Sequence, residues 1–186
     1  TASPNEDLPT DLVKPARTLN AILGVSTVAL LTMVDPIAGA SLALHTYTIK
    51  YVSQIMLEAL PALTSIITVL AYRQSKKQIS KNNWLAISAI FLGLTAASKY
   101  LYCIIAFAIL TDWFLEAKRQ NDLKNFYKQV LFWGILAVAM FFAANPFLWP
   151  DPIQRLTESI FYHAKYSTGA EEVQRYNFPF WQPLDW

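Results

Sequence analysis

Lys99 is the residue whose type and position most clearly suggest chemistry. It lies near the middle of the largely apolar stretch Trp84–Leu115, and the adjoining Ser98 and Tyr100 give it no neighbouring acidic partner. An ammonium group at a membrane edge can pair with the phosphate of a lipid-linked donor. The alternative is a lysine that merely extends from a helix end to the interface. The lack of a sequence-local acid favours the phosphate-binding interpretation.

Lys50 and Glu58 could act at the same place. Lys50 is a second candidate phosphate ligand, although a break in the helical pattern over residues 50–53 could simply expose it. Glu58 could hold a lysine or position the hydroxyl group of an acceptor. It could equally form a structural ion pair with Lys50 or Arg17, and the sequence leaves both interpretations open.

Metal and nucleotide chemistry have little support in the sequence. His45 and His163 are far apart, and neither has a second histidine three or four residues away. Metal ligation requires three or four convergent donors, so we predict no metal site and keep both histidines as acceptor-side or ion-pair candidates. The sequence contains no glycine-rich phosphate-binding motif and no nucleophilic-serine motif.

Long apolar runs must position these side chains. Hydrophobic residues make up 54% of the chain and charged residues 15%, and charged or proline-containing breaks separate the apolar runs. Trp84–Leu115 is too long for one crossing of a hydrocarbon core about 30 Å thick and suits two short crossings, with a tight turn near Ser98–Leu101. We predict an all-α, polytopic membrane protein with about six transmembrane helices. They cover residues 19–34, 37–49, 55–72, the two halves of 84–115, and 129–144.

Two basic loops set the predicted topology. Arg73–Asn83 and Glu116–Lys128 are rich in Lys and Arg, and the positive-inside tendency assigns both to the cytoplasm. Alternation of the helices then places five ionisable residues at extracytoplasmic helix ends: Arg17, His45, Lys50, Glu58 and Lys99. We expect a multi-pass protein of the plasma membrane whose polar site faces outward.

Three regions follow from this pattern. Residues 1–13 form a polar lead-in loop, residues 14–144 the transmembrane core, and residues 145–186 an extracytoplasmic interfacial segment rich in aromatic residues and proline. Apolar positions recur at helical spacing over Ile153–Tyr166, which predicts a short amphipathic helix at the outer interface; a simple anchor loop is the alternative. The aromatic residues of this segment would sit at headgroup depth: Trp149, Tyr162, Phe180, Trp181 and Trp186.

The charge distribution argues against nucleic-acid binding, and the cysteine content argues against a disulfide. The net charge is +2, and the basic residues are concentrated in two short loops rather than along an aromatic-lined groove, so we expect no nucleic-acid binding. The single cysteine, Cys103, excludes an internal disulfide. Its apolar surroundings predict a buried structural thiol.

Several stretches resemble one family of membrane enzymes. Gly93-Leu94-Thr95 and Ser98-Lys99-Tyr100 match a family segment in which Gly-Leu and small residues precede Ser/Thr-Lys-Tyr after a basic cytoplasmic loop. The stretches RTLNAILGVSTVALL, YTIKYVSQIMLEAL, HAKYSTG and YNFPFWQPLDW are also similar to members of this family. It is the protein O-mannosyltransferase and aminoarabinose transferase superfamily of GT-C glycosyltransferases, and the resemblance covers most of the chain from about Lys14 onward.

The resemblance implies inverting transfer of a sugar from a polyprenyl-phosphate donor to a hydroxyl group of a protein or lipid, on the outer face of the membrane. It implies a donor-phosphate role for Lys99, with Arg17 and Lys50 as weaker neighbours, and an acceptor-side or ion-pair role for Glu58. A carboxylate would take the acceptor's proton while cations stabilise the leaving phosphate. The family's catalytic acid lies in its first extracytoplasmic loop, which we expect to precede Thr1, so no catalytic residue is assigned. No cofactor beyond the donor substrate is expected.

Two other functions remain open. A non-catalytic, transferase-derived subunit that packs within a larger membrane complex would not need the catalytic loop. A small transporter would need ionisable residues at mid-membrane depth, whereas those of this chain fall at predicted helix ends. The expected partners are the lipid bilayer, the lipid-linked sugar donor, a protein or lipid acceptor and other membrane subunits.

Overall fold

Helices account for nearly all of the described chain. The structure, a computed structural model, describes residues 10–52, 58–77 and 81–169. These ranges contain helices and no strand, which confirms the all-α prediction. The helices are α1 (Thr10–Val34), α2 (Pro36–Leu44), α3 (Thr46–Val52), α4 (Ala59–Ser75), α5 (Lys81–Ser98), the 3-10 helix η1 (Tyr100–Ile104), α6 (Ile105–Arg119), α7 (Leu123–Ala143), the 3-10 helix η2 (Pro146–Leu148) and α8 (Pro152–Gly169).

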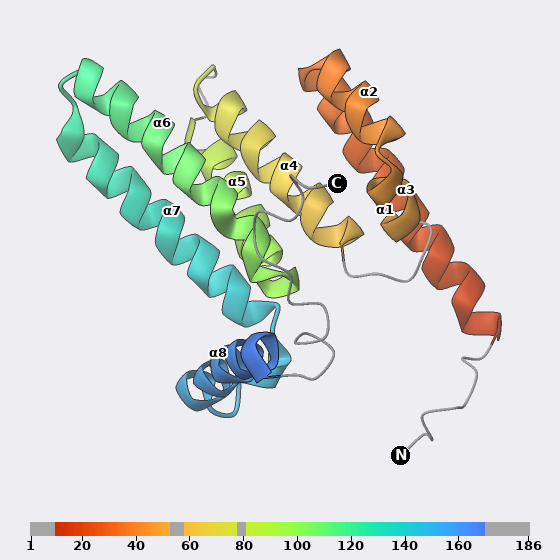
Figure 1. The fold of residues 1–186 in the computed structure, drawn as a ribbon. Coiled ribbons are helices and arrows are strands. Elements are labelled where there is room, and N and C mark those ends of the chain that lie inside the picture. The colour runs from red at the N-terminus through yellow and green to blue at the C-terminus, as the bar shows by residue number, and fades with distance from the viewer. Residues whose placement is uncertain (1–9, 53–57, 78–80, 170–186) are drawn as a thin grey trace. The chain divides into compact units, whose positions relative to one another are not determined.

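The chain divides into two compact units, residues 1–144 and residues 145–186. Within the first unit the chain direction alternates: α1, α4 and α6 run one way, α5 and α7 run the other way, and α2 and α3 return along α1 (Figure 1). Helix α5 packs against both α4 and α7, and α1 packs against α4. The C-terminus of α4 and the α6–α7 turn therefore lie at one end of this unit, and Glu58 and Lys99 lie at the other.

Hydroxyl-bearing residues occupy the centre of this helix packing. Thr68, Ser88 and Thr95 are all 0% exposed. The Thr95 hydroxyl donates to the Thr64 hydroxyl at 2.9 Å, and the Ser88 hydroxyl donates to the Thr68 carbonyl at 3.0 Å, so both bonds join α5 to α4. The Trp133 indole of α7 donates to the Ser88 hydroxyl at 3.2 Å. Small and hydroxyl-bearing residues at helix contacts are typical of helices that associate in lipid.

Trp113 joins α6 to its neighbours. Its ring lies 5.7 Å from that of Tyr72 in α4 and 5.9 and 6.4 Å, centroid to centroid, from those of Phe126 and Trp133 in α7. All four side chains are buried. The half-buried Cys103 lies at the edge of this apolar cluster, so the predicted thiol is only partly enclosed.

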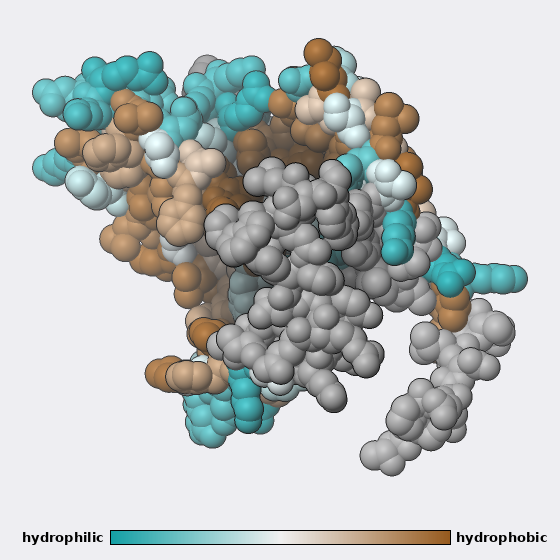
Figure 2. Space-filling view, viewed as in Figure 1, coloured by the Kyte–Doolittle hydropathy of each residue, from teal (hydrophilic) through white to brown (hydrophobic). Residues whose placement is uncertain are grey.

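Three helices of the described ranges are long and apolar enough to cross a membrane: Leu12–Val34, Tyr100–Arg119 and Leu123–Ala143. Many of their outward side chains are apolar, with exposed fractions of 68% at Val25, 73% at Phe107 and 64% at Leu131. In Figure 2 the surface of α6 and α7 is apolar along the helices and hydrophilic at the end where the two join. Because soluble monomers rarely expose large contiguous apolar patches, this surface suits a lipid environment.

The second apolar run differs from the prediction. We expected one helix over residues 37–49, but the chain forms two short helices, α2 and α3, with His45 between them in an extended conformation (φ −71°, ψ 114°). The His45 Nδ1 atom lies 3.0 Å from the Thr48 hydroxyl and accepts from the Thr48 N–H at 3.4 Å, so this side chain caps α3. The polar sequence His-Thr-Tyr-Thr supplies a cap that competes with helix continuation. Neither short helix reaches the roughly 20 residues that a crossing needs.

Helix boundaries also differ at the predicted loops. Helix α1 begins at Thr10, inside the predicted lead-in, whose residues 1–9 lie outside the described ranges. Most of the predicted basic loop 116–128 is helical, because α6 continues to Arg119 and α7 starts at Leu123. The chain reverses between them at Asn121, which has a positive φ of 54°. Asparagine tolerates this left-handed conformation better than most residues.

The second unit contains η2 and α8 among its described residues. The predicted helix over 153–166 is confirmed within α8, and its exposed apolar residues are Ile153, Ile160 and Phe161. The Arg155 guanidinium donates to the Phe147 carbonyl at 2.8 Å and lies 4.8 Å from that ring's centroid, which ties α8 to η2. The headgroup positions predicted for Phe180, Trp181 and Trp186 lie outside the described residues.

Gly93 provides a test of the α5–α7 contact. A Cβ atom at Gly93 would lie 2.4 Å from the Ala137 carbonyl oxygen and 2.7 Å from the Met140 Cβ. We therefore expect Gly93→Ala to lower the free energy of unfolding by about 1–3 kcal/mol, because the helices must separate. The matched control is Gly134→Ala in α7, where a Cβ atom meets nothing within 4 Å. Unfolding in detergent, followed by circular dichroism, should show a loss for the first variant and none for the second; equal stability would contradict the close approach.

Candidate functional site

Glu58, Lys99 and Tyr102 form a polar group, the Lys99 cluster, at one end of the first unit. The Lys99 ammonium forms an ion pair with the Glu58 carboxylate, and the Tyr102 hydroxyl donates to the other oxygen of that carboxylate at 2.9 Å. Glu58 immediately precedes α4, whereas Lys99 and Tyr102 belong to the junction of α5 and η1. Two segments far apart in the sequence thus meet through one carboxylate.

The backbone at Lys99 explains how its side chain reaches Glu58. Helix α5 ends at Ser98, and Lys99 is extended (φ −162°, ψ 115°) before η1 begins at Tyr100. The Lys99 N–H donates to the Thr95 carbonyl at 2.9 Å, and the Lys99 carbonyl accepts from the Tyr102 N–H at 3.2 Å. The helix break predicted near Ser98–Leu101 is therefore confirmed.

The Lys99 cluster is accessible and contains opposite charges. The Lys99 side chain is 41% exposed and that of Glu58 is 31% exposed. The hydrogen bond from Lys99 lowers the pKa of the Glu58 carboxyl group from its usual value of 4.5, with a further contribution from Tyr102, and these effects outweigh partial desolvation. The carboxylate is therefore ionised at neutral pH, so it can accept hydrogen bonds and hold the ammonium in place.

Glu58 and Lys99 are the predicted site residues whose direct contact the structure defines. For Glu58 the sequence left open a structural ion pair with Lys50 or Arg17; the pair described here is with Lys99. Arg17 lies on α1 and Lys50 on α3, both with exposed side chains. His45 caps α3, as described above. His163 lies in α8, and its side chain is outside the described residues.

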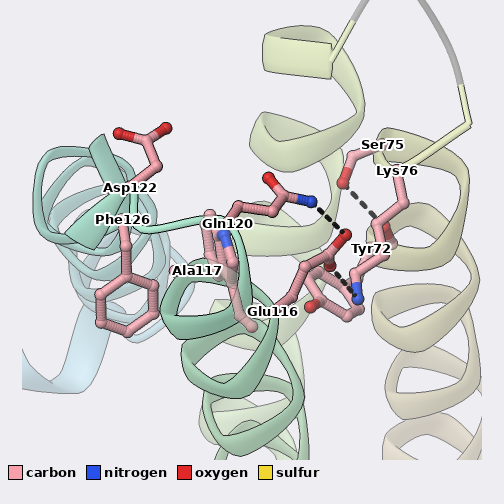
Figure 3. A pocket seen from close by; sticks show the side chains of 9 residues that line it. Tyr72, Ser75, Lys76, Glu116, Ala117, Gln120, Asp122 and Phe126 are labelled. Carbon is pink, nitrogen blue, oxygen red and sulfur yellow. Dashed lines mark hydrogen bonds and ion pairs between the residues drawn. The ribbon is translucent and has the colours of Figure 1, made fainter. Parts of the chain in front are cut away.

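A second ionic group, which sequence analysis missed, lies at the opposite end of α4. In this Lys76 cluster the Lys76 ammonium contacts the Asp112 carboxylate at 2.5 Å and the Glu116 carboxylate at 2.6 Å, and the Tyr72 hydroxyl donates to Asp112 at 2.9 Å. Figure 3 shows Lys76 reaching from α4 toward Glu116 of α6. Asp112 and Glu116 are one helical turn apart in the sequence. This spacing of two acidic residues, together with the basic loop Arg73–Asn83, is the sequence signal that could have revealed the cluster.

Partial desolvation by itself lowers the pKa of the Lys76 ammonium. The hydrogen bonds to Asp112, Glu116 and Tyr72 outweigh this effect, so the net pKa is raised and Lys76 remains charged throughout the physiological range. Among the described residues, no group of three or more His, Cys, Asp or Glu side chains could hold a metal ion.

Comparison with known protein families, with curated proteins and with solved structures finds no match for this chain. The functional argument therefore rests on the residues and contacts described above.

The pKa of Glu58 predicts how stability depends on pH. A carboxyl group whose pKa is lowered by folding stabilises the folded state above its unfolded value of 4.5, and this contribution is lost as the pH falls below that value. We expect the unfolding midpoint of the wild type to fall more steeply below about pH 4.5 than that of Glu58→Gln. The control is Glu158→Gln, an exposed position of α8, which should follow the wild type. Parallel curves for wild type and Glu58→Gln would contradict the charged pair.

Proposed function

We propose that this chain is the membrane-embedded helical core of a GT-C-type glycosyltransferase that uses a polyprenyl-phosphate-linked sugar donor. The observation that carries the proposal is the Lys99 cluster, which lies at the end of the first unit opposite the two basic turns. The segment that resembles the family, Gly93 to Tyr100, ends at the helix break that presents Lys99. A cation held at the end of apolar helices lies at the depth of a lipid-borne phosphate.

The proposed topology extends the three candidate spans to a multi-pass arrangement. Helices α4 and α5, with 17 and 18 residues, are short for a crossing but pack within the same unit and alternate in direction. Helices α2 and α3 together return along α1 as a broken segment. The basic residues of the α4–α5 and α6–α7 turns would face the cytoplasm, and the Lys99 cluster would face outward.

In this proposal Glu58 holds Lys99 in position until the donor binds. The donor phosphate competes with the Glu58 carboxylate for the ammonium group, because both are anionic hydrogen-bond acceptors. Lys99 then stabilises the negative charge that grows on the phosphate as the glycosidic bond breaks. The general base that deprotonates the acceptor is not assigned to any residue of this chain.

Two substitutions that break the same ion pair distinguish a donor-binding role of Lys99 from a purely structural role. In the full-length protein, Lys99→Ala removes the cation and should raise the KM for the lipid-linked donor about tenfold or more. Glu58→Gln also breaks the pair but keeps the cation, so donor KM should change about twofold at most. Lys76→Ala, which removes a paired lysine at the other end of α4, is the matched control and should leave donor KM unchanged. Sugar transfer to acceptor in membranes, measured over a range of donor concentrations, provides these values.

The same experiment addresses the second candidate function. Lys99 already has an acidic partner, which favours a structural role and hence a non-catalytic, transferase-derived subunit. In that case Lys99→Ala and Glu58→Gln would weaken folding alike and would have equal, small effects on transfer. Equal effects of the two variants would therefore overturn the donor-phosphate role.

The topology is tested by the labelling of single cysteines. Replacing the one native cysteine, Cys103→Ser, gives a background in which Lys77→Cys and Lys118→Cys mark the two basic turns. In intact cells a membrane-impermeant thiol reagent should label neither turn, and it should label both after permeabilisation. Phe147→Cys, which is exposed after the end of α7, should be labelled without permeabilisation. Labelling of the basic turns in intact cells would invert the arrangement and remove the proposal.

A further inference from the structure

Helix α8 has an exposed apolar side. Ile153 and Ile160 are seven residues apart and therefore lie on the same side of the helix, and Phe161 borders them. Their exposed fractions are 81%, 54% and 70%. In Figure 2 apolar side chains line one edge of α8 and hydrophilic side chains line the opposite edge. These three residues are called the apolar side of α8 below.

Thr157 lies among these residues, and its hydroxyl group is satisfied within the helix. That hydroxyl donates to the Ile153 carbonyl at 2.7 Å. A hydroxyl group costs free energy in an apolar medium chiefly when it lacks a hydrogen-bond partner. The apolar side of α8 can therefore enter lipid without leaving this donor unpaired.

Charged and amide groups lie on a different side of α8. Gln154 and Glu158 are one turn apart and exposed, and the Gln154 amide donates to the Glu158 carboxylate at 2.8 Å. Lys165 follows Glu158 by seven residues and so lies on the same side of the helix. These groups keep their contact with water when the apolar side of α8 is covered.

A third side of α8 packs against η2. Arg155, Leu156 and Ser159 are half-buried, and Arg155 contacts the carbonyl and the ring of Phe147, as described above. This contact fixes the Arg155 charge away from Ile153, which lies two residues earlier and on the other side of the helix. The packing against η2 leaves the apolar side of α8 exposed.

The connection to α7 indicates what covers this side. Helix α7 is long and apolar enough to cross a membrane, and eight residues separate its end at Ala143 from the start of α8 at Pro152. A chain that leaves the hydrocarbon at the end of α7 thus reaches α8 within a few residues. Trp149, in this connection, and Tyr162, in α8, are exposed. Aromatic rings with one polar atom suit the depth of lipid headgroups.

The charge of the second unit indicates how it would bind a bilayer. Among the described residues, Asp151 and Glu158 balance Arg155 and Lys165. Residues 170–186 contain three acidic residues and one basic residue, which adds a net charge of −2. Electrostatic attraction to anionic lipid is therefore absent, and burial of apolar surface is the remaining source of affinity.

From these observations we infer that α8 lies in the plane of the bilayer interface, with Ile153, Ile160 and Phe161 against the acyl chains and Glu158 and Lys165 in water. The inference rests on the crossing of the membrane by α7, and neither on sugar transfer nor on the side at which α8 emerges. Zwitterionic phosphatidylcholine is sufficient as the partner, because the contact depends on apolar burial.

Spin labels on single cysteines provide the test. In the Cys103→Ser background of the full-length protein, reconstituted in phosphatidylcholine bilayers, labels are placed by Ile153→Cys, Ile160→Cys and Glu158→Cys. Oxygen concentrates in lipid, whereas a water-soluble nickel complex stays outside. We expect the ratio of oxygen to nickel accessibility to be about tenfold higher at the first two positions than at the third, because the apolar side lies about 5–10 Å below the headgroup boundary.

Other occupants of the apolar side give different results. Access of the nickel complex to all three positions would place the whole helix in water. Exclusion of both reagents from positions 153 and 160 would show that protein covers them. Where a second copy is the cover, the labels also broaden one another's spectra, and dilution with unlabelled protein removes the broadening. Each of these results would overturn the inference.

A charge on either side of α8 tests the source of the affinity. With the label at Ile153→Cys, Ile160→Asp should lower the accessibility ratio about tenfold, because a carboxylate among acyl chains is costly. Gln154→Asp introduces the same charge on the hydrophilic side and should leave the ratio unchanged. Addition of phosphatidylglycerol should not raise the ratio of the otherwise unchanged protein. An interfacial depth seen only with this anionic lipid would contradict insertion by apolar burial.

The outcome is separable from that of the proposed function. If the two basic turns are labelled in intact cells, the proposed topology fails, but the accessibilities measured along α8 still decide its position. Conversely, an α8 that lies in water would leave the expected effect of Lys99→Ala on donor KM as it stands.

Discussion

The fold depends on hydrogen bonds between hydroxyl-bearing residues at the α4–α5–α7 contact. In lipid the hydrophobic effect does not drive helices together, so close packing and interhelical hydrogen bonds must do so. Thr64, Thr68, Ser88 and Thr95 supply these bonds, and the Trp133 indole extends them to α7. Gly93 allows the backbones to approach at the same contact. Large apolar side chains are found both inside, as at Trp113 and Trp133, and outside, as at Val25, Phe107 and Leu131.

Charged residues then act at the two ends of this packed centre. Glu58 and Lys99 join the start of α4 to the end of α5, and Lys76 joins the end of α4 to Asp112 and Glu116 of α6. Pairs with this exposure contribute little to stability, so their value lies in fixing side-chain positions rather than in holding the helices together. The two ends nevertheless differ chemically: one presents a lysine with a single carboxylate, and the other presents a surplus of carboxylates beside aromatic rings.

The sequence predicted the positions of helices, which depend on local residue patterns. It missed the long-range side-chain contacts, which depend on how each helix is rotated against its neighbours. Apolar runs located the helices, and the polar interruption at Lys99 located the break between α5 and η1. The break at His45 depends on a side-chain cap with Thr48, which competes with an otherwise acceptable helix. The partner of Lys99 lies 41 residues away and that of Lys76 lies 36 residues away, and no period within one helix reveals either. Asp112 was overlooked because it lies within the largely apolar stretch Trp84–Leu115, which was assigned to two membrane crossings.

Helix α4 also has a fixed length between its charged ends. From Glu58 to Lys76 the chain advances 18 residues, which corresponds to about 27 Å at 1.5 Å per residue. This is slightly less than the hydrocarbon thickness of an average bilayer, about 30 Å. If α4 crosses the bilayer as proposed, a thicker membrane would draw one ionic cluster into the acyl chains unless the bilayer thinned around the protein. In that proposal the distance between the two clusters would match the protein to a thin bilayer.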